Sequence, residues 1–335
     1  MKHYAGLDLS METTAVCVVN EAGLKVHAES VESTPEAIAK ALIRVGSVER
    51  AVIETGRMSG AICLGLKELG VPIVCIDARQ AHQSLKAMKA NKTDPHDAAG
   101  LAQLARTGFY KGVHVKSAPA QGVRSSITAR SRLVEERVRL DNMIRGLCAS
   151  FGIKIGPGQG KGFVERAKAA DRIPGLGEAV TSLLSVREAL VDQIKVLDCF
   201  LAEVARMSTA CQNLMSIPGV NVQTSAAFAA AIDDAERFTR SRTAGAYFGL
   251  VPRRYQSGET EWTDRITKQG DAMVRRLLYE AANSILTRIK KSLALKRWAL
   301  KIARRRGLRK ASVALARRLA VIMHAMLRDG TLFEA

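Results

Sequence analysis

The spacing of apolar residues in the first third of the chain alternates between the strand period and the helix period. Three runs rich in β-branched residues predict three consecutive strands, at 4–10, 13–20 and 24–30. A helical pattern at 35–45 follows, with Thr34 as its N-cap and Pro35 at its first position. Further strands are predicted at 50–54 and 72–77, with a helix at 58–69 between them and two helical stretches up to residue 107. The first third therefore predicts an α/β domain.

Three strands, a helix and then alternating strands and helices is the element order of a ribonuclease-H-like fold, and by pattern alone a generic α/β domain fits equally well. From about residue 116 to 205 the apolar residues keep helical spacing, for example at Val134, Val138 and Ile144. A Gly-rich break at 156–160 divides this segment, which predicts an antiparallel helical arm of the coiled-coil type. The charged surface of the arm is either a solvated face or a contact for nucleic acid or a partner.

Beyond residue 206 the chain is predicted to be mainly helical. Ser216–Val220 precedes an Ala-rich helix, and a Gly- and Arg-rich stretch covers 249–268 before helical patterns continue to the end. The sequence thus predicts three domains: an α/β domain at 1–115, a helical arm at 116–205 and a mainly helical domain at 206–335.

The net charge is distributed unevenly between the N-terminal and C-terminal parts of the chain. The 335 residues carry 51 Lys and Arg against 32 Asp and Glu, a formal charge of +19. Residues 1–120 contribute +2 of this and residues 201–335 contribute +13, and within 288–318 there are 13 basic residues and no acidic one. This asymmetry predicts nucleic acid as a partner. The stretch 288–318, which includes Arg304, Arg305 and Arg306, is therefore assigned to phosphate-backbone binding, with a merely solvated basic face as the alternative.

Several protein classes are excluded by what the sequence lacks. No apolar run approaches the roughly 20 residues of a membrane-spanning helix. The N-terminus becomes acidic at Asp8 before a signal-peptide core forms, which argues against secretion. The six cysteines form no Cys-x-x-Cys pair, which favours reduced core thiols over a zinc site or a disulfide framework. We expect a cytoplasmic, nucleoid-associated protein with no membrane partner.

Four carboxylates are the strongest candidates for chemistry. Asp8 lies between apolar residues of a predicted strand and Glu54 ends another. Asp94 and Asp97 are three residues apart and share one face of a helix. In a ribonuclease-H-like fold the first strand, the fourth strand and the last helix converge, so the four groups would hold two Mg²⁺ ions about 4 Å apart for phosphodiester chemistry. Each also has a structural alternative: a helix N-cap at Asp94, a dipole-favoured first turn at Asp97, an exposed strand end at Glu54 and a turn hydrogen bond at Asp8.

A second candidate centres on Ser257, in a predicted Ser-Gly turn. Such a turn by itself is usually only a turn. This one is flanked by Arg253, Arg254, Arg265 and Lys268, which would fix a phosphate beside a hydroxyl nucleophile. The sequence therefore keeps Ser257 as a candidate nucleophile.

Two further positions are candidates for nucleic-acid contact. Arg275 follows the basic stretch around Ser257. Gly219 lies between two predicted helices, in the manner of a helix-hairpin-helix whose backbone amides bind a phosphate without reading sequence. A plain turn between helices fits Gly219 equally well.

Taken in order, these motifs resemble the DEDD family of insertion-sequence transposases, which are relatives of the Piv-type DNA invertases. The resemblance covers most of the chain outside the arm, at 6–8, 54–56, 92–98, 216–219, 247–252, 256–258 and 266–268. It implies that Asp8, Glu54, Asp94 and Asp97 are the Mg²⁺-binding carboxylates of a RuvC-like domain and that Ser257 is the catalytic serine of a C-terminal transposase domain. It also implies double-stranded DNA at element ends and target as substrate, a homo-oligomer (dimer or tetramer), and a structured noncoding guide RNA that pairs with that DNA.

The expected function is cutting and rejoining of DNA strands through Ser257, assisted by Mg²⁺ at the four carboxylates. The main alternative is a metal-only nuclease of the Holliday-junction resolvase type, in which Ser257 is structural. An actin-like kinase is a further alternative, because Gly6–Ser10 also resembles the first phosphate loop of that superfamily, although no second Asp-x-Gly loop follows in the rear half. The last alternative is a non-catalytic nucleic-acid-binding protein whose carboxylates are caps and turns.

Overall fold

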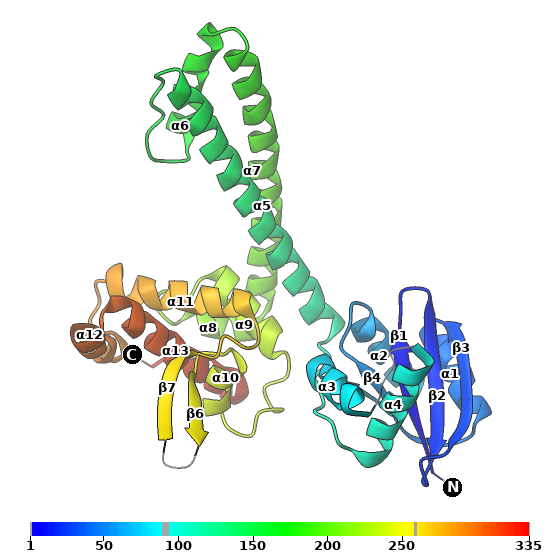
Figure 1. Ribbon diagram of the computed structural model, residues 1–335. Coiled ribbons are helices and arrows are strands. Elements are labelled where there is room, and N and C mark those ends of the chain that lie inside the picture. The colour runs from blue at the N-terminus through cyan, green and yellow to red at the C-terminus, as the bar shows by residue number, and fades with distance from the viewer. Residues whose placement is uncertain (1, 89–93, 258–259, 335) are drawn as a thin grey trace. The chain divides into compact units, whose positions relative to one another are not determined.

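Strand β1 (His3–Leu9) lies at the centre of a five-stranded sheet, because its middle residues Ala5, Gly6 and Leu7 are small or apolar and all buried. The computed structural model describes residues 2–88, 94–257 and 260–334, and its strand order in this sheet is β3-β2-β1-β4-β5 (Figure 1). The other strands are β2 (Thr13–Asn20), β3 (Lys25–Glu32), β4 (Val48–Glu54) and β5 (Ile73–Ile76). Strands β1 to β3 pair antiparallel, whereas β4 pairs parallel to both β1 and β5. This topology is that of a ribonuclease-H-like sheet, and it confirms the α/β prediction.

Helices cover both faces of the sheet. Side chains from α1 (Pro35–Arg44) and α2 (Ser59–Glu68) share one apolar core with Leu7 and Ile53. On the opposite face, α4 (Asp94–Thr107) packs against Val52, and α3 (Ala78–Met88) adds to the same cluster. The predicted N-cap of α1 is confirmed, because Thr34 Oγ1 accepts a hydrogen bond from the backbone N–H of Ala37 at 3.3 Å.

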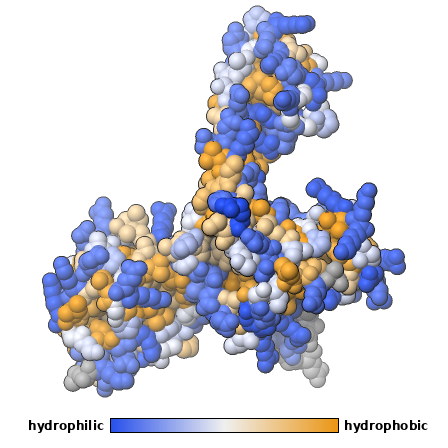
Figure 2. Space-filling model, turned by 180° about the vertical axis from the view of Figure 1, so that it is seen from behind, coloured by the Kyte–Doolittle hydropathy of each residue, from blue (hydrophilic) through white to orange (hydrophobic). Residues whose placement is uncertain are grey.

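The middle of the chain forms an arm of two long helices, α5 (Ala118–Ser150) and α7 (Leu176–Met207), which run antiparallel along each other (Figure 1). Between them lie α6 (Lys161–Ala167) and a short 3-10 helix at Lys168–Arg172. Figure 2 shows that the surface of the arm mixes hydrophilic with apolar side chains, and the exposed fractions of Val196 and Phe200 are 58% and 45%. The predicted helical arm is therefore present, with apolar residues left on its surface.

Helix α9 is the centre of the C-terminal core, because eight of its eleven residues are buried. The helices of this region are α8 (Thr209–Met215), α9 (Val222–Ile232), α10 (Arg242–Tyr247), α11 (Ala272–Thr287), α12 (Ala294–Arg306) and α13 (Leu308–Asp329). Residues Ile127 of α5 and Leu201 of α7 belong to the same apolar core. A hairpin of β6 (Pro252–Ser257) and β7 (Thr260–Ile266) occupies the Gly- and Arg-rich stretch, for which the sequence predicted no strands.

The chain contains two compact units. The first unit is residues 1–117, two residues from the predicted boundary, and the second is 118–335, which contains both the arm and the C-terminal region. All six cysteines lie within the described residues, where none of them forms a disulfide and five of them are buried. Among the helices that the structure describes, none is both long and apolar enough to cross a membrane.

Candidate active site and nucleic-acid interface

Asp8 and Glu54 lie at the carboxyl ends of two neighbouring parallel strands. The register pairs Gly6 with Val52 and Leu7 with Ile53, so Asp8 and Glu54 occupy the next position along β1 and β4. Because side chains alternate between the faces of a sheet, these two residues share the face of Gly6 and Val52, which is the face that α4 covers. Both carboxylates are partly buried there.

Helix α4 runs antiparallel to β1. Near its C-terminal end, Gln103 Nε2 donates a hydrogen bond to the carbonyl of Gly23 at 2.7 Å, and Arg106 donates to the carbonyl of Glu21 at 3.3 Å. Both acceptors belong to the turn beside the first residues of β1. The N-terminal end of α4, with Asp94 and Asp97, therefore lies at the carboxyl end of β1.

The acidic residues of β1 and α4 lie at similar distances beyond the point where the strand and the helix touch. A Cβ built on Gly6 would lie 2.1 Å from the carbonyl oxygen of Ala98, so these two backbones are in contact. Asp8 lies about 7 Å further along β1 from Gly6, and Asp94 lies about 6 Å along α4 from Ala98 in the same direction. Asp97 precedes the buried Leu101 by one helical turn, on the face toward the sheet. The fold therefore brings all four acidic positions toward one end of the sheet.

The chemistry of these residues fits a hard divalent cation, which prefers carboxylate oxygens. Among the side chains that the structure describes, no three His, Cys, Asp or Glu come together as a metal site. The side chain of Asp94 lies outside that described set. Mg²⁺ is usually bound by one or two carboxylates together with waters and substrate phosphates, so a closed protein cage is not required.

Asp94 and Asp97 both stand at the start of α4. Helix α4 begins at Asp94, and Asp97 stands in its first turn, where the helix dipole favours an acidic residue. His96, in the same turn, is exposed. The metal-binding role of the carboxylates stays a prediction.

Ser257 is the last residue of β6, and its backbone pairs with that of Thr260 at the start of β7. Two residues earlier on the same face of the hairpin, Tyr255 stacks on its cross-strand partner Trp262, with ring centroids 5.7 Å apart. The two aromatic side chains are 53% and 51% exposed. The side chain of Ser257 and residues 258–259 lie outside the described residues, so its role as nucleophile stays a prediction.

Basic side chains surround this hairpin. Arg253, Arg254, Arg265 and Lys268 are all exposed, and Lys268 has a left-handed backbone conformation with φ of 55°. Exposed guanidinium groups on a short ribbon are well placed to bind phosphates. The sequence identified these cations, but it missed the stacked pair Tyr255–Trp262, whose signal is the placement of two aromatic residues at equal distances from one turn.

Two of the predicted nucleic-acid contacts have a visible structural role. Arg275 Nη1 donates hydrogen bonds to the carbonyl oxygens of Phe248 and Gln269, at 3.0 and 2.9 Å, and so ties together two segments at the foot of the hairpin. Gly219, with φ of +91°, lies in the turn between α8 and α9, where a Cβ would come 3.1 Å from the carbonyl of Ala281 in α11. A role for either residue in binding phosphate stays a prediction.

Arg304, Arg305 and Arg306 form the last turn of α12, and all three are exposed. Cations in a last turn are favoured by the helix dipole, which is a local reason for part of this charge. The dipole does not account for the other ten basic residues of 288–318. A polyanion facing this segment would account for them.

Two family models match the chain. One, described as the transposase IS116/IS110/IS902 family, matches residues 211–299, which include Ser257; the other, a DEDD transposase model of the IS110 type, matches residues 5–151, which include the four carboxylates. The transposase for insertion sequence element IS1111A of Coxiella burnetii is 30% identical over 332 residues, covering 96% of this chain and 88% of that protein. The chain belongs to the IS110 family of transposases. The resemblance drawn from the sequence is confirmed.

Other proteins are similar over shorter parts. A probable family 20 transposase of Pseudomonas aeruginosa is 32% identical over 277 residues, covering 80% of this chain and 81% of that protein. Among solved structures, RuvC of T. thermophilus in complex with a Holliday junction substrate aligns with 34% of this chain at 18% identity and a TM-score of 0.26, and we draw no conclusion from that likeness. As an IS110-family transposase, the protein is an enzyme that acts on DNA.

Proposed function

We propose that this transposase cuts and rejoins DNA strands through Ser257, assisted by a divalent cation, Mg²⁺, held by Asp8, Glu54, Asp94 and Asp97. The observation that supports the metal site is the antiparallel course of α4, because the positions of Asp94 and Asp97 on the helix then lie toward the sheet end where β1 and β4 reach Asp8 and Glu54. Hard oxygen ligands at one sheet end are the donor set that this cation requires.

The chemistry at Ser257 is nucleophilic substitution at phosphorus. Its Oγ forms a bond to the phosphorus of a DNA phosphodiester, the bond from phosphorus to a deoxyribose oxygen breaks, and that oxygen takes up a proton. The hydroxyl of a second strand then attacks the phosphoserine and regenerates Ser257. Arg253, Arg254 and Lys268 would hold the phosphate in position for both steps. A bound divalent cation would supply electrostatic stabilisation of the negative charge that develops on the oxygens.

The partners follow from the family and from the surface. Double-stranded DNA of element ends and target is the proposed substrate, and a structured noncoding guide RNA is proposed from the family resemblance. The basic residues of 288–318 support binding of either polyanion. Half-exposed apolar residues on the arm, such as Val196 and Phe200, support a homo-oligomer, because such surface commonly marks contact with another protein.

One assay tests the proposal against a metal-only nuclease. Wild-type protein, incubated with its cognate element-end DNA and Mg²⁺ and then denatured, is expected to leave a DNA-linked protein band that Ser257→Ala does not form. We expect cleavage to fall at least 100-fold in each of four carboxylate variants, Asp8→Asn, Glu54→Gln, Asp94→Asn and Asp97→Asn. DNA binding should stay within about twofold of wild type, because each replacement removes a negatively charged oxygen ligand and keeps the shape of the side chain.

The matched control is Glu68→Gln, which removes an exposed carboxylate of α2 in the same unit and should cleave normally. If Ser257→Ala cuts DNA at the wild-type rate, the metal-only nuclease is the correct function. Normal cleavage by the carboxylate variants would instead remove the metal site from the proposal.

A further inference from the structure

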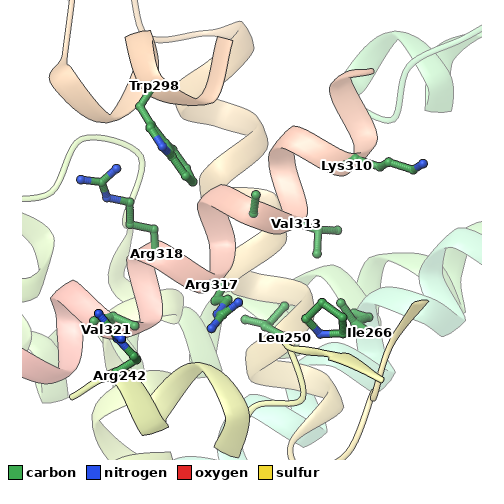
Figure 3. Close-up of a pocket in the computed structure, with 11 residues that line it drawn as sticks. Arg242, Leu250, Ile266, Trp298, Lys310, Val313, Arg317, Arg318 and Val321 are labelled. Carbon is green, nitrogen blue, oxygen red and sulfur yellow. The ribbon is translucent and has the colours of Figure 1, made fainter. Parts of the chain in front are cut away.

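A cavity of about 460 Å³ lies between α10, α12, α13 and the foot of the β6–β7 hairpin (Figure 3). Its volume is within the range of about 300–1,000 Å³ that is typical of sites for small ligands. Helix α13 contributes one face to it, at Lys310, Val313, Arg317 and Val321, which recur every three or four residues. Its cations Lys310, Arg317 and Arg318 belong to the basic segment 288–318, but the function proposed so far leaves the cavity itself and its apolar walls unexplained.

The walls of the cavity are apolar and partly aromatic. Leu250 lines it from the connection between α10 and β6, Ile266 from β7 and Val313 from α13. Trp298 of α12 forms another wall, and the guanidinium carbon of Arg318 lies 4.7 Å from the centroid of its ring. A flat aromatic face beside apolar side chains is a surface on which planar, uncharged ring systems bind well.

The rim carries only positive charge. Arg242, Lys310, Arg317 and Arg318 line the cavity and no acidic residue does, although Lys310 extends away from the other three in Figure 3. Among the residues that the structure describes, none of these cations has a carboxylate within 4.0 Å, in contrast to arm residues such as Arg139, which lies 2.8 Å from Glu136. An anionic group at the rim would supply the missing partner.

We propose that this cavity binds one unstacked nucleotide of a single-stranded nucleic acid. The base lies against Trp298 and the apolar wall, and the flanking phosphates bind Arg242, Arg317 and Arg318. A ring with a negative group at its edge matches an apolar slot with a cationic rim, whereas a base inside a duplex is stacked on both sides and cannot enter a concave site.

The place of the cavity links it to the proposed function, on which this inference rests. Pro252 and Ile266 pair with each other at the foot of the hairpin, and both line the cavity. Ser257 is five residues further along β6, about 16 Å away. A nucleotide held in the cavity would therefore fix the path of a strand a few nucleotides from the proposed scissile phosphate.

The test uses the fluorescence of Trp298. The chain has two tryptophans, so Trp262→Phe leaves Trp298 as the only one. We expect saturable quenching by single-stranded pentathymidylate, and binding at least tenfold weaker for an abasic pentanucleotide of equal charge and for a duplex of the same sequence. Fluorescence anisotropy of labelled pentathymidylate should show about 5- to 150-fold weaker binding to Trp298→Leu, the range expected for the loss of one stacked base.

Two variants separate the cavity from general attraction to basic protein. Arg318→Ala should weaken binding, whereas Arg328→Ala, which removes an exposed cation of the same helix outside both the cavity and the basic segment 288–318, should bind as wild type. Both change exposed side chains, so circular dichroism should show an unchanged fold. Ala314→Glu, which adds a negative charge inside the cavity, should also weaken binding.

Equal affinity for the abasic and normal oligonucleotides, or equal effects of Arg318→Ala and Arg328→Ala, would overturn the inference and show that binding is only general attraction to a basic surface. The outcome is independent of strand cleavage, because the binding assay uses no scissile substrate. A missing Ser257 adduct with normal pentathymidylate binding would contradict the proposed function alone. A normal adduct without that binding would contradict this inference alone.

Discussion

The backbone of Ala98 in α4 occupies the space that a side chain on Gly6 in β1 would need. A Cβ at position 6 would lie 2.1 Å from the carbonyl oxygen of Ala98 and 2.2 Å from the amide nitrogen of Ala102. Real atoms do not approach so closely, and backbone atoms cannot move aside as a flexible side chain can. The contact therefore fixes the distance between helix and sheet, and with it the position of Asp97 relative to Asp8.

Replacing Gly6 with Ala should consequently displace α4. We expect Gly6→Ala to lower the free energy of unfolding of the N-terminal unit by at least about 3 kcal/mol, the upper part of the range for overpacked cores. Urea denaturation followed by circular dichroism measures this change. Gly56→Ala is the matched control in the same unit, because a Cβ at Gly56 meets nothing within 4 Å, and its stability should stay within about 1 kcal/mol of wild type. Equal stability of the two variants would contradict the tight contact.

Local signals in the sequence were sufficient for much of the first unit. Strand β2 has the predicted bounds 13–20, and α1 begins after Thr34, because turns, caps and β-branched runs act on their immediate neighbours. The contact of Gly6 with Ala98 joins residues 92 positions apart, and no local pattern encodes it. The sequence could therefore name the acidic residues, whereas their convergence needed an assumed fold.

The parts that the sequence missed have physical reasons. The β6–β7 hairpin carries exposed residues at consecutive positions, from Arg253 to Gln256, so it lacks the alternation of apolar and polar residues that reveals a half-buried strand. The cavity beside Trp298 is assembled from residues 242 to 321 on several elements. The sequence shows that this region is rich in cations. It does not show that apolar residues from separate elements form a wall between them.

A buried ion pair should stabilise the far end of the arm. Arg187 Nε donates to Asp141 Oδ1 at 2.6 Å, and the two side chains are 7% and 0% exposed. The Arg187→Met variant leaves the Asp141 carboxylate buried without its partner, so the free energy of unfolding should fall by about 3–5 kcal/mol in urea denaturation.

A second replacement separates this electrostatic effect from lost packing. Adding Asp141→Leu to Arg187→Met removes the stranded charge and should recover most of the lost stability. Arg132→Met is the surface control, because Arg132 pairs with Glu135 at 2.8 Å while both are largely exposed, and it should cost no more than about 1 kcal/mol. A double variant as unstable as Arg187→Met would show that packing around Arg187 dominates.

Stability should also fall in mild acid because of His324. Its ring is fully buried, with Nδ1 3.0 Å from Ser241 Oγ and an edge-to-face contact with Phe238, and burial lowers the pKa of this histidine below its usual range, with Arg328 and Arg237 acting in the same direction. The unfolded chain then binds more protons than the folded one below pH about 6.5, so the free energy of unfolding decreases as the pH falls, by at most about 1.4 kcal/mol per pH unit.

Urea midpoints at pH 7.5 and 5.0 measure this dependence. His324→Gln should lower stability at pH 7.5 and show a smaller loss between the two pH values, because the titrating group is gone. His82→Gln changes an exposed histidine of α3 and should keep the wild-type dependence. An unchanged pH dependence in His324→Gln would assign the acid sensitivity to other groups.

The basic segment 288–318 should bind nucleic acid through its phosphates. Replacing Arg304, Arg305 and Arg306 together with Ala should weaken binding of DNA and guide RNA of any sequence, and the slope of log affinity against log salt should become shallower by about 0.7–0.9 per lost phosphate contact, because fewer counterions are released. Target choice should not change, since backbone contacts carry no base information.

The control with equal charge loss replaces three arm arginines that already pair with a glutamate three residues away, Arg132, Arg139 and Arg206. If both triple variants have the same slope of log affinity against log salt, the α12 arginines do not bind phosphates and only form a solvated surface.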